Sequence, residues 1–391
     1  MEAGSLKSPD HPSLITLLHA DMNIGYDAKR ALFNRSGLGN YSRSTIRLLS
    51  HFYPENKYYL FTPKNSQILF QPSGNQFIIE PEQGIPASFP SIWRTWGIHR
   101  MIKNQKTDIY HGLSNELPWS IEKTGVKSVV TIHDLIFLRF PEYYPVIDRQ
   151  IYFFKFRHAC RVADRIIATS ESTKADIITF FGTDPQKIDV VYQTCDPVFR
   201  NLVSATKKAE VRKKYELPEK FILYLGTIEK RKNALTLIKA YLNSNSSIPL
   251  LIAGKPTAYL SEISDFLKQN QAGDSIIFRY TIESADLPAL YQSASIFVYP
   301  SVFEGFGIPI LEALYSGIPV ITSTGSCFAE TGGDAALYCD PYDVQQMSTC
   351  ISKVFNNPET RESMVKKGFA HAAKFDEVHV ASNLMRVYQK L

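Results

Sequence analysis

Residues 295–317 constrain the fold more than any other stretch of the chain. They begin with an apolar run, Ser295–Tyr299, that has the length and β-branched content of a buried strand. A turn bracketed by Gly305 and Gly307 follows. A short helix is then predicted from Ile308-Pro309 to Gly317, because proline favours the start of a helix and glycine the residue past its end. This succession is the unit from which parallel α/β sheets are built.

The same stretch carries groups that suit a ligand. Backbone N–H groups at a helix N-terminus have no partner within the helix, so they attract anions. Glu304 and Glu312 flank this position with seven residues between them. Carboxylates repel phosphate but accept hydrogen bonds from hydroxyls, and a sugar nucleotide carries both phosphate and hydroxyls. The alternative is an ordinary strand–helix turn with two surface glutamates.

Composition excludes several classes of protein. The 391 residues suffice for two domains, and 44% hydrophobic and 21% charged residues are typical of soluble globular proteins. A net charge of +5 is too mild for a nucleic-acid-binding protein. The five cysteines form no C-x-x-C pair, which indicates a reducing, cytoplasmic compartment and neither disulfides nor a zinc site. Residues 1–21 resemble no signal peptide and are expected to be an extension without assigned function.

The first half of the chain contains two candidate ligand-binding segments. Gly37, Gly39 and Asn40 are expected in a loop between a strand at 22–27 and a helix at 42–51, although tight turns require glycine for conformation alone. His133 follows a buried strand at 128–132, at the strand end where ligands bind in open α/β sheets. A loop-closing role is the alternative for His133. Asp134 is expected to stabilise the loop.

A basic segment with tryptophans, residues 91–103, has helical spacing. Ile92, Trp93 and Trp96 can form one face, with Arg94 and other basic residues elsewhere. Such a helix suits a membrane interface. The alternative is a domain helix with its tryptophans in the core.

The second half repeats the pattern of strands and helices after a polar, lysine-rich segment, 200–215, which is expected to be a linker. A strand at 221–225 ends in Gly226 and Thr227, and the cations Lys230, Arg231 and Lys232 precede a helix. A charge run usually marks a solvated surface. This run is short and stands at a strand end, where a diphosphate would bind.

These motifs resemble retaining glycosyltransferases of family four, which have the GT-B fold. The resemblance rests on F-E-G-F-G-I-P-I-L-E-A, on G-T-x-E-x-R-K-N and on the H-D-L-I-F-L-R-F-P-E-Y-Y-P segment that begins at His133. It implies two Rossmann-like, doubly wound domains that face each other across a cleft. The acceptor-side domain would be 22–205, the donor-binding domain 206–375, and a helix at 376–391 would cross back to the first domain.

The resemblance also implies roles for residues of this sequence. Glu304, His133, Arg231 and Lys232 are expected to be catalytic. The expected donor-binding residues are Gly37, Gly39, Asn40, Gly226, Thr227, Arg231, Lys232, Tyr280, Thr281, Ile282, Glu304, Gly305, Phe306, Gly307, Ile308 and Glu312. Thr227 stands where some members have an arginine, so the assignment of individual cations to individual phosphates stays open.

The implied reaction is transfer of a hexose with retention, from GDP-mannose to a glycan or lipid-linked acceptor, in bacterial surface polysaccharide assembly. Peripheral contact with the inner membrane face would accompany such an acceptor. No two aspartates lie two residues apart, so a D-x-D metal motif is absent from the sequence, and neither a metal nor a cofactor is expected. A UDP-sugar donor, a sugar-nucleotide epimerase and a silent nucleotide-binding subunit are the alternatives. A glycosidase would have no use for the adjacent anion site.

Overall fold

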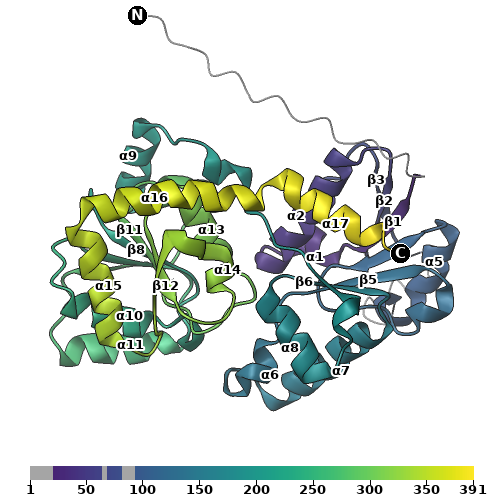
Figure 1. Cartoon of the computed structure of the whole chain (residues 1–391), viewed down its shortest axis with the longest axis horizontal. Coiled ribbons are helices and arrows are strands. Elements are labelled where there is room, and N and C mark those ends of the chain that lie inside the picture. Colours follow the sequence, from purple (N-terminus) through teal and green to yellow (C-terminus); the bar gives the residue numbers. More distant parts are fainter. Residues whose placement is uncertain (1–20, 64–67, 82–92) are drawn as a thin grey trace, which may run out of the picture.

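The computed structural model of the chain describes residues 21–63, 68–81 and 93–391. It contains two lobes, each built on a parallel sheet with helices packed on both faces (Figure 1). The two sheets confirm the expected fold class of two Rossmann-like domains. The expected N-terminal extension, apart from Asp21, lies outside the described residues, as do Ile92 and the side chain of Trp96.

The first sheet has seven strands in the order β3-β2-β1-β4-β5-β6-β7. Its strands are β1 Asn23–Asp27, β2 Lys57–Phe61, β3 Gln76–Ile79, β4 Ile109–Gly112, β5 Lys127–Ile132, β6 Arg165–Ala168 and β7 Ile188–Val190. Its helices are α1 Lys29–Phe33, α2 Gly37–Phe52, α5 Ile98–Asn104, α6 Ile136–Arg139, α7 Val146–Val162 and α8 Glu171–Phe181. Ile24 of β1 pairs with Tyr58 of β2 and with Ile109 of β4, so the strand order reverses at β1.

The second sheet has six strands in the order β10-β9-β8-β11-β12-β13. Its strands are β8 Ile222–Leu225, β9 Leu250–Ala253, β10 Ile276–Arg279, β11 Ile296–Tyr299, β12 Val320–Ser323 and β13 Ala336–Cys339. The helices of this half are α9 Ala205–Lys214, α10 Ala234–Asn243, α11 Tyr259–Gln269, α12 Leu287–Tyr291, α13 Ile308–Tyr315, α14 Phe328–Gly332, α15 Val344–Asn356, α16 Pro358–Ala372 and α17 Glu377–Tyr388. The strand order reverses between β8 and β11, and ligands bind at such reversals.

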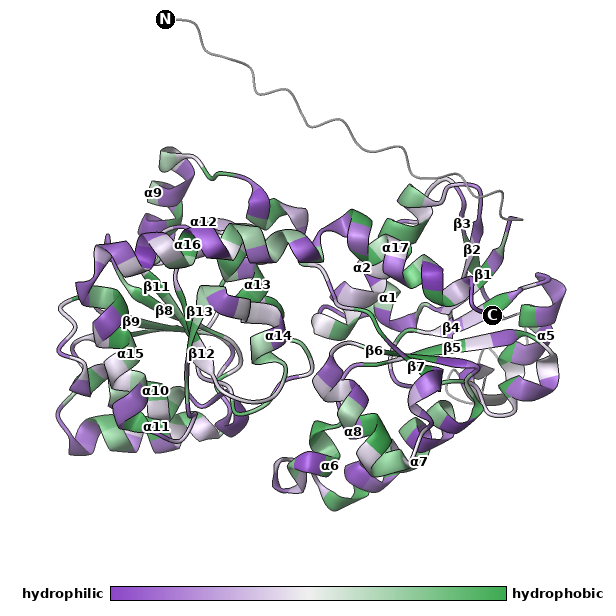
Figure 2. Ribbon diagram, in the orientation of Figure 1, coloured by the Kyte–Doolittle hydropathy of each residue, from purple (hydrophilic) through white to green (hydrophobic). Residues whose placement is uncertain are grey.

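Continuous apolar strands form the cores, because helices cover both faces of each sheet. Central strands such as β5, β8 and β11 are mostly hydrophobic in Figure 2, and their residues Val130, Leu223 and Val298 are fully buried. In the first domain, α2 shares one core with α17, while α5 and α7 contribute to the core on the other face.

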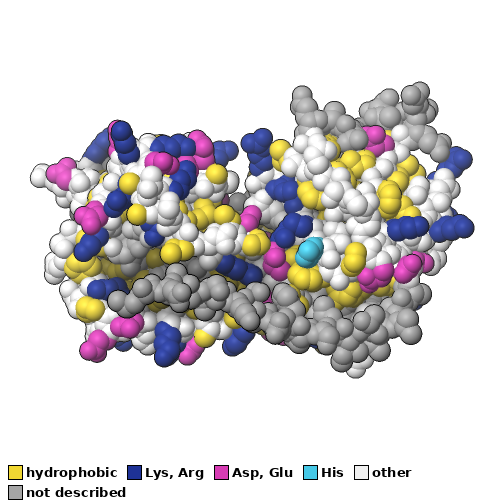
Figure 3. All heavy atoms as spheres, turned by 90° about the horizontal axis from the view of Figure 1, so that it is seen from above, with side chains coloured by type: hydrophobic (Ala, Val, Ile, Leu, Met, Phe, Trp, Pro, Cys, Tyr) yellow, Lys and Arg dark blue, Asp and Glu magenta, His cyan; other side chains and the backbone are white. Residues whose placement is uncertain are grey.

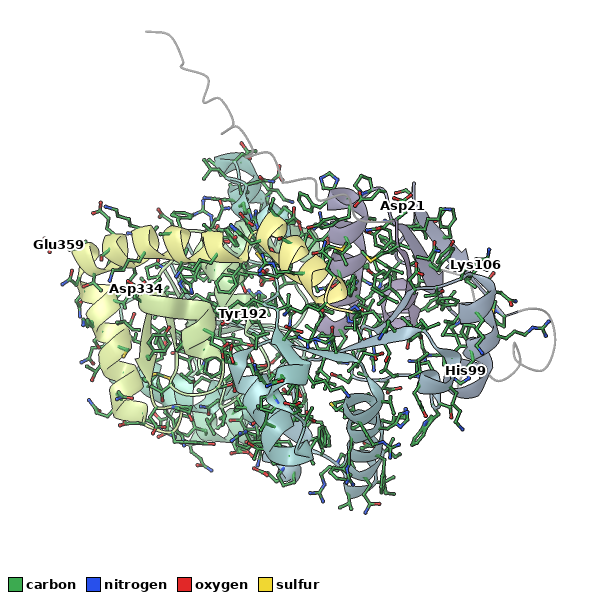
Figure 4. All side chains as sticks on the ribbon, turned by 45° about the vertical axis from the view of Figure 1, so that its right-hand side comes forward. Asp21, His99, Lys106, Tyr192, Asp334 and Glu359 are labelled. Atoms are coloured by element: carbon green, nitrogen blue, oxygen red, sulfur yellow. The ribbon has the colours of Figure 1, made fainter. Side chains whose placement is uncertain are left out.

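The last two long helices connect the domains. α16 packs on α13 of the second domain, and α17 packs on α2 of the first (Figure 1, yellow). Asp376 caps the N-terminus of α17, and its side chain accepts a hydrogen bond from the backbone of His379. Tyr192, where the chain passes from one domain to the other, stacks on Phe306 and lies near the domain boundary in Figure 4.

Two expectations about local structure are wrong, and the structure decides a third point that the sequence left open. Gly37 and Gly39 do not precede α2 but form its first turn, and a Cβ on Gly39 would lie 1.9 Å from the carbonyl oxygen of Asn34. That close approach requires glycine at position 39. The segment expected as a linker contains helix α9, which packs on α12. Trp93 is only 2% exposed and belongs to the core, so it does not face a membrane.

Candidate active site

The strongest cluster of charged groups lies at the strand-order reversal of the second sheet. Arg231 and Lys232 follow β8, and Glu304 follows β11. Oε1 of Glu304 lies 2.8 Å from Nη1 of Arg231 and 2.5 Å from Nζ of Lys232. The Glu304 side chain is 12% exposed. The tertiary fold thus brings together three side chains that the sequence indicated separately.

The two cations determine the ionisation of Glu304. Burial alone would raise the pKa of Glu304, but the charges of Arg231 and Lys232 outweigh it and lower the pKa to about 2. Burial lowers the pKa of Lys232, although Glu304 opposes this effect. Glu304 is therefore a carboxylate at neutral pH, between two cations that an anionic ligand could also contact.

Tyr299 supports this cluster and was not indicated by the sequence. Nζ of Lys232 donates to its hydroxyl at 2.7 Å and lies 5.0 Å from the centre of its ring. Nη1 of Arg231 also donates to the carbonyl oxygen of Phe303 at 2.7 Å. These contacts hold both cations beside Glu304. The only sequence signal for Tyr299 was its place at the end of β11.

A cavity of about 590 Å³ lies between the two domains, and Arg231, Lys232 and Glu304 are not among its lining residues. It is lined from the first domain by Gly37, Asn40 and the cations Arg35, Arg43 and Arg47, and from the second by Ser284, Leu287, Ile308 and Glu312, among others. Figure 3 shows Lys and Arg side chains where the two lobes meet. The spacing of Arg43 and Arg47, four residues apart on α2, was the available signal for this basic wall.

Glu312 lies in the wall of the cavity. It is the fifth residue of α13 and stands in the second turn of that helix. The hydroxyl of Tyr291 donates to its Oε2 at 2.9 Å. Burial raises the pKa of Glu312 to about 7, so this carboxyl responds to pH near neutrality.

His133 lies across the cleft from Glu304, directly after β5. Its ring is buried, its Nε2 lies 2.9 Å from the carbonyl oxygen of Leu113, and its backbone N–H donates to Asn115. Burial lowers its pKa to about 4. A Cβ on Gly305 would lie 2.0 Å from the carbonyl oxygen of His133, so only glycine permits this approach of the two domains. Asp134 accepts a hydrogen bond from the backbone of Ile136, as a loop-stabilising residue does.

A buried chain of polar groups reaches from α17 to His133. The hydroxyl of Tyr388 lies 2.6 Å from Nδ1 of His111, and Nε2 of His111 lies 2.8 Å from the hydroxyl of Thr131. Thr131 in turn contacts the hydroxyl of Tyr41 at 2.9 Å. The ring of Tyr41 meets the ring of His133 edge to face at 4.5 Å. Sequence reasoning missed this network because its members are far apart in the chain.

The remaining predicted donor residues fall into two groups. Gly226 and Thr227 follow β8 beside the cation cluster, and Gly307 begins α13 with a positive φ of 94°. Tyr280 is 45% exposed and, like Thr281 and Ile282, is not among the residues lining the cavity, where Ser284 and Leu287 stand instead. The side chain of Phe306 is buried against Tyr192, so only its backbone can meet a ligand.

Within the described ranges, no group of three or more His, Cys, Asp and Glu side chains is placed to hold a metal ion. None of the helices described has both the length and the apolar character needed to cross a membrane.

Comparison with known proteins relates the site to a family. Residues 207–371 match the family described as glycosyl transferases group 1, and residues 41–199 match glycosyltransferase family 4. O-antigen chain mannosyltransferase B of Escherichia coli is 31% identical over 296 residues, which cover 74% of this chain and 76% of that protein. O-antigen chain mannosyltransferase RfbU of Salmonella typhimurium is 28% identical over 232 residues, 59% of this chain and 61% of that protein.

Solved structures with the same fold span nearly the whole chain. Sucrose-phosphate synthase from Thermosynechococcus elongatus has a TM-score of 0.75 at 19% identity, covering 94% of this chain and 98% of that one. HepE of Anabaena in complex with UDP-glucose has a TM-score of 0.71 at 15% identity, covering 95% of this chain and 100% of that one. At these identities the likeness concerns the fold alone. Together with the 31% identical relative, the two family matches show that this chain belongs to glycosyltransferase family 4, whose members have the GT-B fold.

Proposed function

We propose that this glycosyltransferase transfers mannose from GDP-mannose, with retention of configuration, to a glycan or lipid-linked acceptor. The observation that carries the proposal is the placement of Glu304 against Arg231 and Lys232 at the strand-order reversal of the second domain, whose Glu312 lines a cavity shared by both domains. The sugar is inferred from the relatives named as O-antigen mannosyltransferases. The acceptor-side and donor domains are taken as 22–205 and 206–375, with 376–391 crossing back.

The proposed chemistry assigns each charged group a role. Arg231, Lys232 and the backbone N–H groups around Gly305–Ile308 would stabilise the departing diphosphate without a metal. Removing one such donor typically costs about 3 kcal/mol of transition-state stabilisation. Glu304 would hold a hydroxyl of the donor sugar, and Glu312 the ribose hydroxyls. The departing phosphate would take the acceptor's proton on the face from which the acceptor attacks.

His133 would meet the acceptor as a hydrogen-bonding group. Its low pKa supports a neutral imidazole at pH 7, which suits contact with a sugar hydroxyl and not with a phosphate. The enzyme would act in the cytoplasm, in peripheral contact with the inner membrane face where a lipid-linked acceptor is held.

The test is thermal unfolding with GDP, UDP and ADP and their sugar conjugates, for the wild type and Lys232→Ala. Ligand at one hundred times its dissociation constant adds about 2.7 kcal/mol to the free energy of unfolding. For a domain of this size, each kcal/mol raises the melting temperature by roughly 2–4 °C. A shift with GDP that weakens in the variant supports the proposal. A shift with UDP alone supports a UDP-sugar donor, the nucleotide held by HepE in its solved complex. No shift in folded protein would refute the donor site.

Turnover separates the remaining alternatives. Incubation with GDP-mannose and a lipid-linked glycan should yield an α-linked product by NMR, since GDP-mannose carries an α-linked sugar. Release of an epimerised sugar nucleotide without transfer would indicate an epimerase. Binding without any product would indicate a silent subunit.

A further inference from the structure

Helix α7, Val146–Val162, concentrates exposed apolar side chains more than any other described element. Of the twelve large hydrophobic residues that are exposed in the described part of the chain, five lie on this helix: Val146, Ile147, Ile151, Tyr152 and Phe154. The others are scattered over separate elements. Scattered apolar residues are ordinary on a protein surface, whereas a contiguous set marks an interaction site.

Three of these residues form one stripe. Ile147, Ile151 and Phe154 are 72%, 45% and 61% exposed, and their spacing of four and three residues places them on one face of the helix. The helix packs on the domain through its C-terminal half, where Phe156, Ala159 and Cys160 are buried. The stripe therefore belongs to the half of α7 that the domain does not cover.

Cations accompany the stripe. α7 carries four basic residues and one acidic residue, Asp148. Arg157 and Arg161 are exposed, and they follow Phe154 on the next turns of the same side. Lys155 is different, because it pairs with Glu116 at 3.2 Å. The guanidinium of Arg157 lies over the ring of Phe153, 5.7 Å from its centre. An apolar stripe with exposed arginines beside it has the chemistry of a helix lying in the headgroup region of an anionic bilayer.

The same charges disfavour a second copy of the chain as the occupant. In a two-fold dimer the patch would face a second copy of itself, so the interface would contain two sets of these arginines, with Asp148 as the one acidic residue that each α7 contributes. An anionic lipid surface provides the opposite charge over the whole patch.

The position of α7 relates the stripe to the cleft. The ring of Phe140, six residues before α7, lies 5.6 Å from the ring of Phe303, which precedes Glu304 in the second domain. α7 thus begins beside the mouth of the active-site cleft and runs along the lower edge of the first domain (Figures 1 and 2). It lies on the face of the sheet opposite α17.

We propose that α7 is the membrane-docking helix of this enzyme: Ile147, Ile151 and Phe154 enter the interface of an anionic bilayer, and Arg157 and Arg161 face its headgroups. The inference deepens the proposed function, because a lipid-linked acceptor is held at the membrane while its sugar enters the cleft. It also replaces Trp93 and its neighbours, the segment that the sequence suggested for this role.

The test is co-sedimentation of the full chain with vesicles of phosphatidylglycerol and phosphatidylethanolamine, compared with vesicles of phosphatidylcholine. The wild type should prefer the anionic vesicles. The double variant Ile147→Ser/Phe154→Ser should lose about tenfold or more in apparent affinity. Arg157→Gln and Arg161→Gln should each reduce the preference for anionic lipid about fivefold. Leu202→Ser is the matched control, because Leu202 is 90% exposed but lies outside α7.

The outcomes separate this inference from the proposed function. The variants carry surface substitutions, so their melting temperatures and the thermal shift with the donor nucleotide should match the wild type. Failure of the wild type to bind anionic vesicles, or equal binding by the double variant, overturns the inference even if the nucleotide shift is present. A concentration-dependent dimer that the double variant abolishes, seen by light scattering, would assign the stripe to self-association and also overturn it.

Discussion

Replacement of Glu304 by glutamine tests the central charge cluster, because it removes the negative charge and keeps the shape of the side chain. The Glu304 side chain is 12% exposed and contacts Arg231 and Lys232 at 2.8 and 2.5 Å. Removing one partner of a buried ion pair leaves the other charge uncompensated, which typically lowers the free energy of unfolding by about 3–5 kcal/mol. The variant should therefore be strongly destabilised although no packing volume is lost.

The pKa of Glu304 provides a second measure of the same effect. Arg231 and Lys232 overcome the effect of burial and lower this pKa from its usual 4.5 to about 2. Such a difference corresponds to about 3 kcal/mol of stability at pH 7. Because the folded-state pKa is the lower one, this stability is present above pH 4.5 and is lost as the pH falls toward 2. The difference between wild type and Glu304→Gln should therefore shrink to about 2 kcal/mol near pH 3.5.

The assay is urea unfolding at pH 7 and near pH 3.5, followed by circular dichroism. Glu229→Gln is the matched control: Glu229 also pairs with Arg231, at 2.7 Å, but its side chain is 36% exposed. Screening by water should limit its effect to less than about 1 kcal/mol. Equal stability of Glu304→Gln and wild type at pH 7, or a difference that grows as the pH falls, would refute the reasoning.

Three further predictions concern the walls of the cleft. His111→Gln should reduce the loss of stability that the protein suffers in acid. Burial lowers the pKa of His111 to about 3, so its contribution to the stability of the wild type is present above pH 6.5 and declines by about 2 kcal/mol by pH 5. Urea unfolding of the wild type and the variant at both pH values measures this difference. Gly305→Ala should lower kcat about a hundredfold without changing the nucleotide thermal shift, because a Cβ would lie 2.0 Å from the His133 carbonyl oxygen; unchanged kcat would contradict the close approach. Burial raises the pKa of Glu312 to about 7, and the ionised carboxylate is the better hydrogen-bond acceptor, so the nucleotide affinity of the wild type should rise about fivefold between pH 6 and 8. Glu312→Gln should abolish this rise, as measured by calorimetry.

Sequence patterns predicted much of the fold and the centre of the candidate site. Apolar runs of four to six residues correspond to buried strands such as β5 and β11, because parallel strands are covered on both faces. Glu304 and the pair Arg231 and Lys232 were indicated because each follows a strand end, where chain direction alone makes ligand-binding groups converge.

Other features could not be read from local pattern. The two glycines near residue 38 look the same in a loop and in the first turn of α2, and only the approach of Asn34 distinguishes the two. Trp93 and Ile147 have similar sequence surroundings, with apolar residues at helical spacing beside cations. Trp93 is nevertheless buried and Ile147 exposed, because burial depends on which neighbouring element covers the helix.

The sequence by itself determined the order of strands and helices, the two-domain α/β class and the chemical types available at each strand end, because these depend on residues close together in the chain. The tertiary structure alone decided which groups meet. Lys232 and Glu304 are 72 residues apart, and His111 and Tyr388 are 277 apart. Such contacts arise from the packing of sheets and domains, which also decides what is desolvated, and desolvation together with neighbouring charge determines the pKa values on which the site depends.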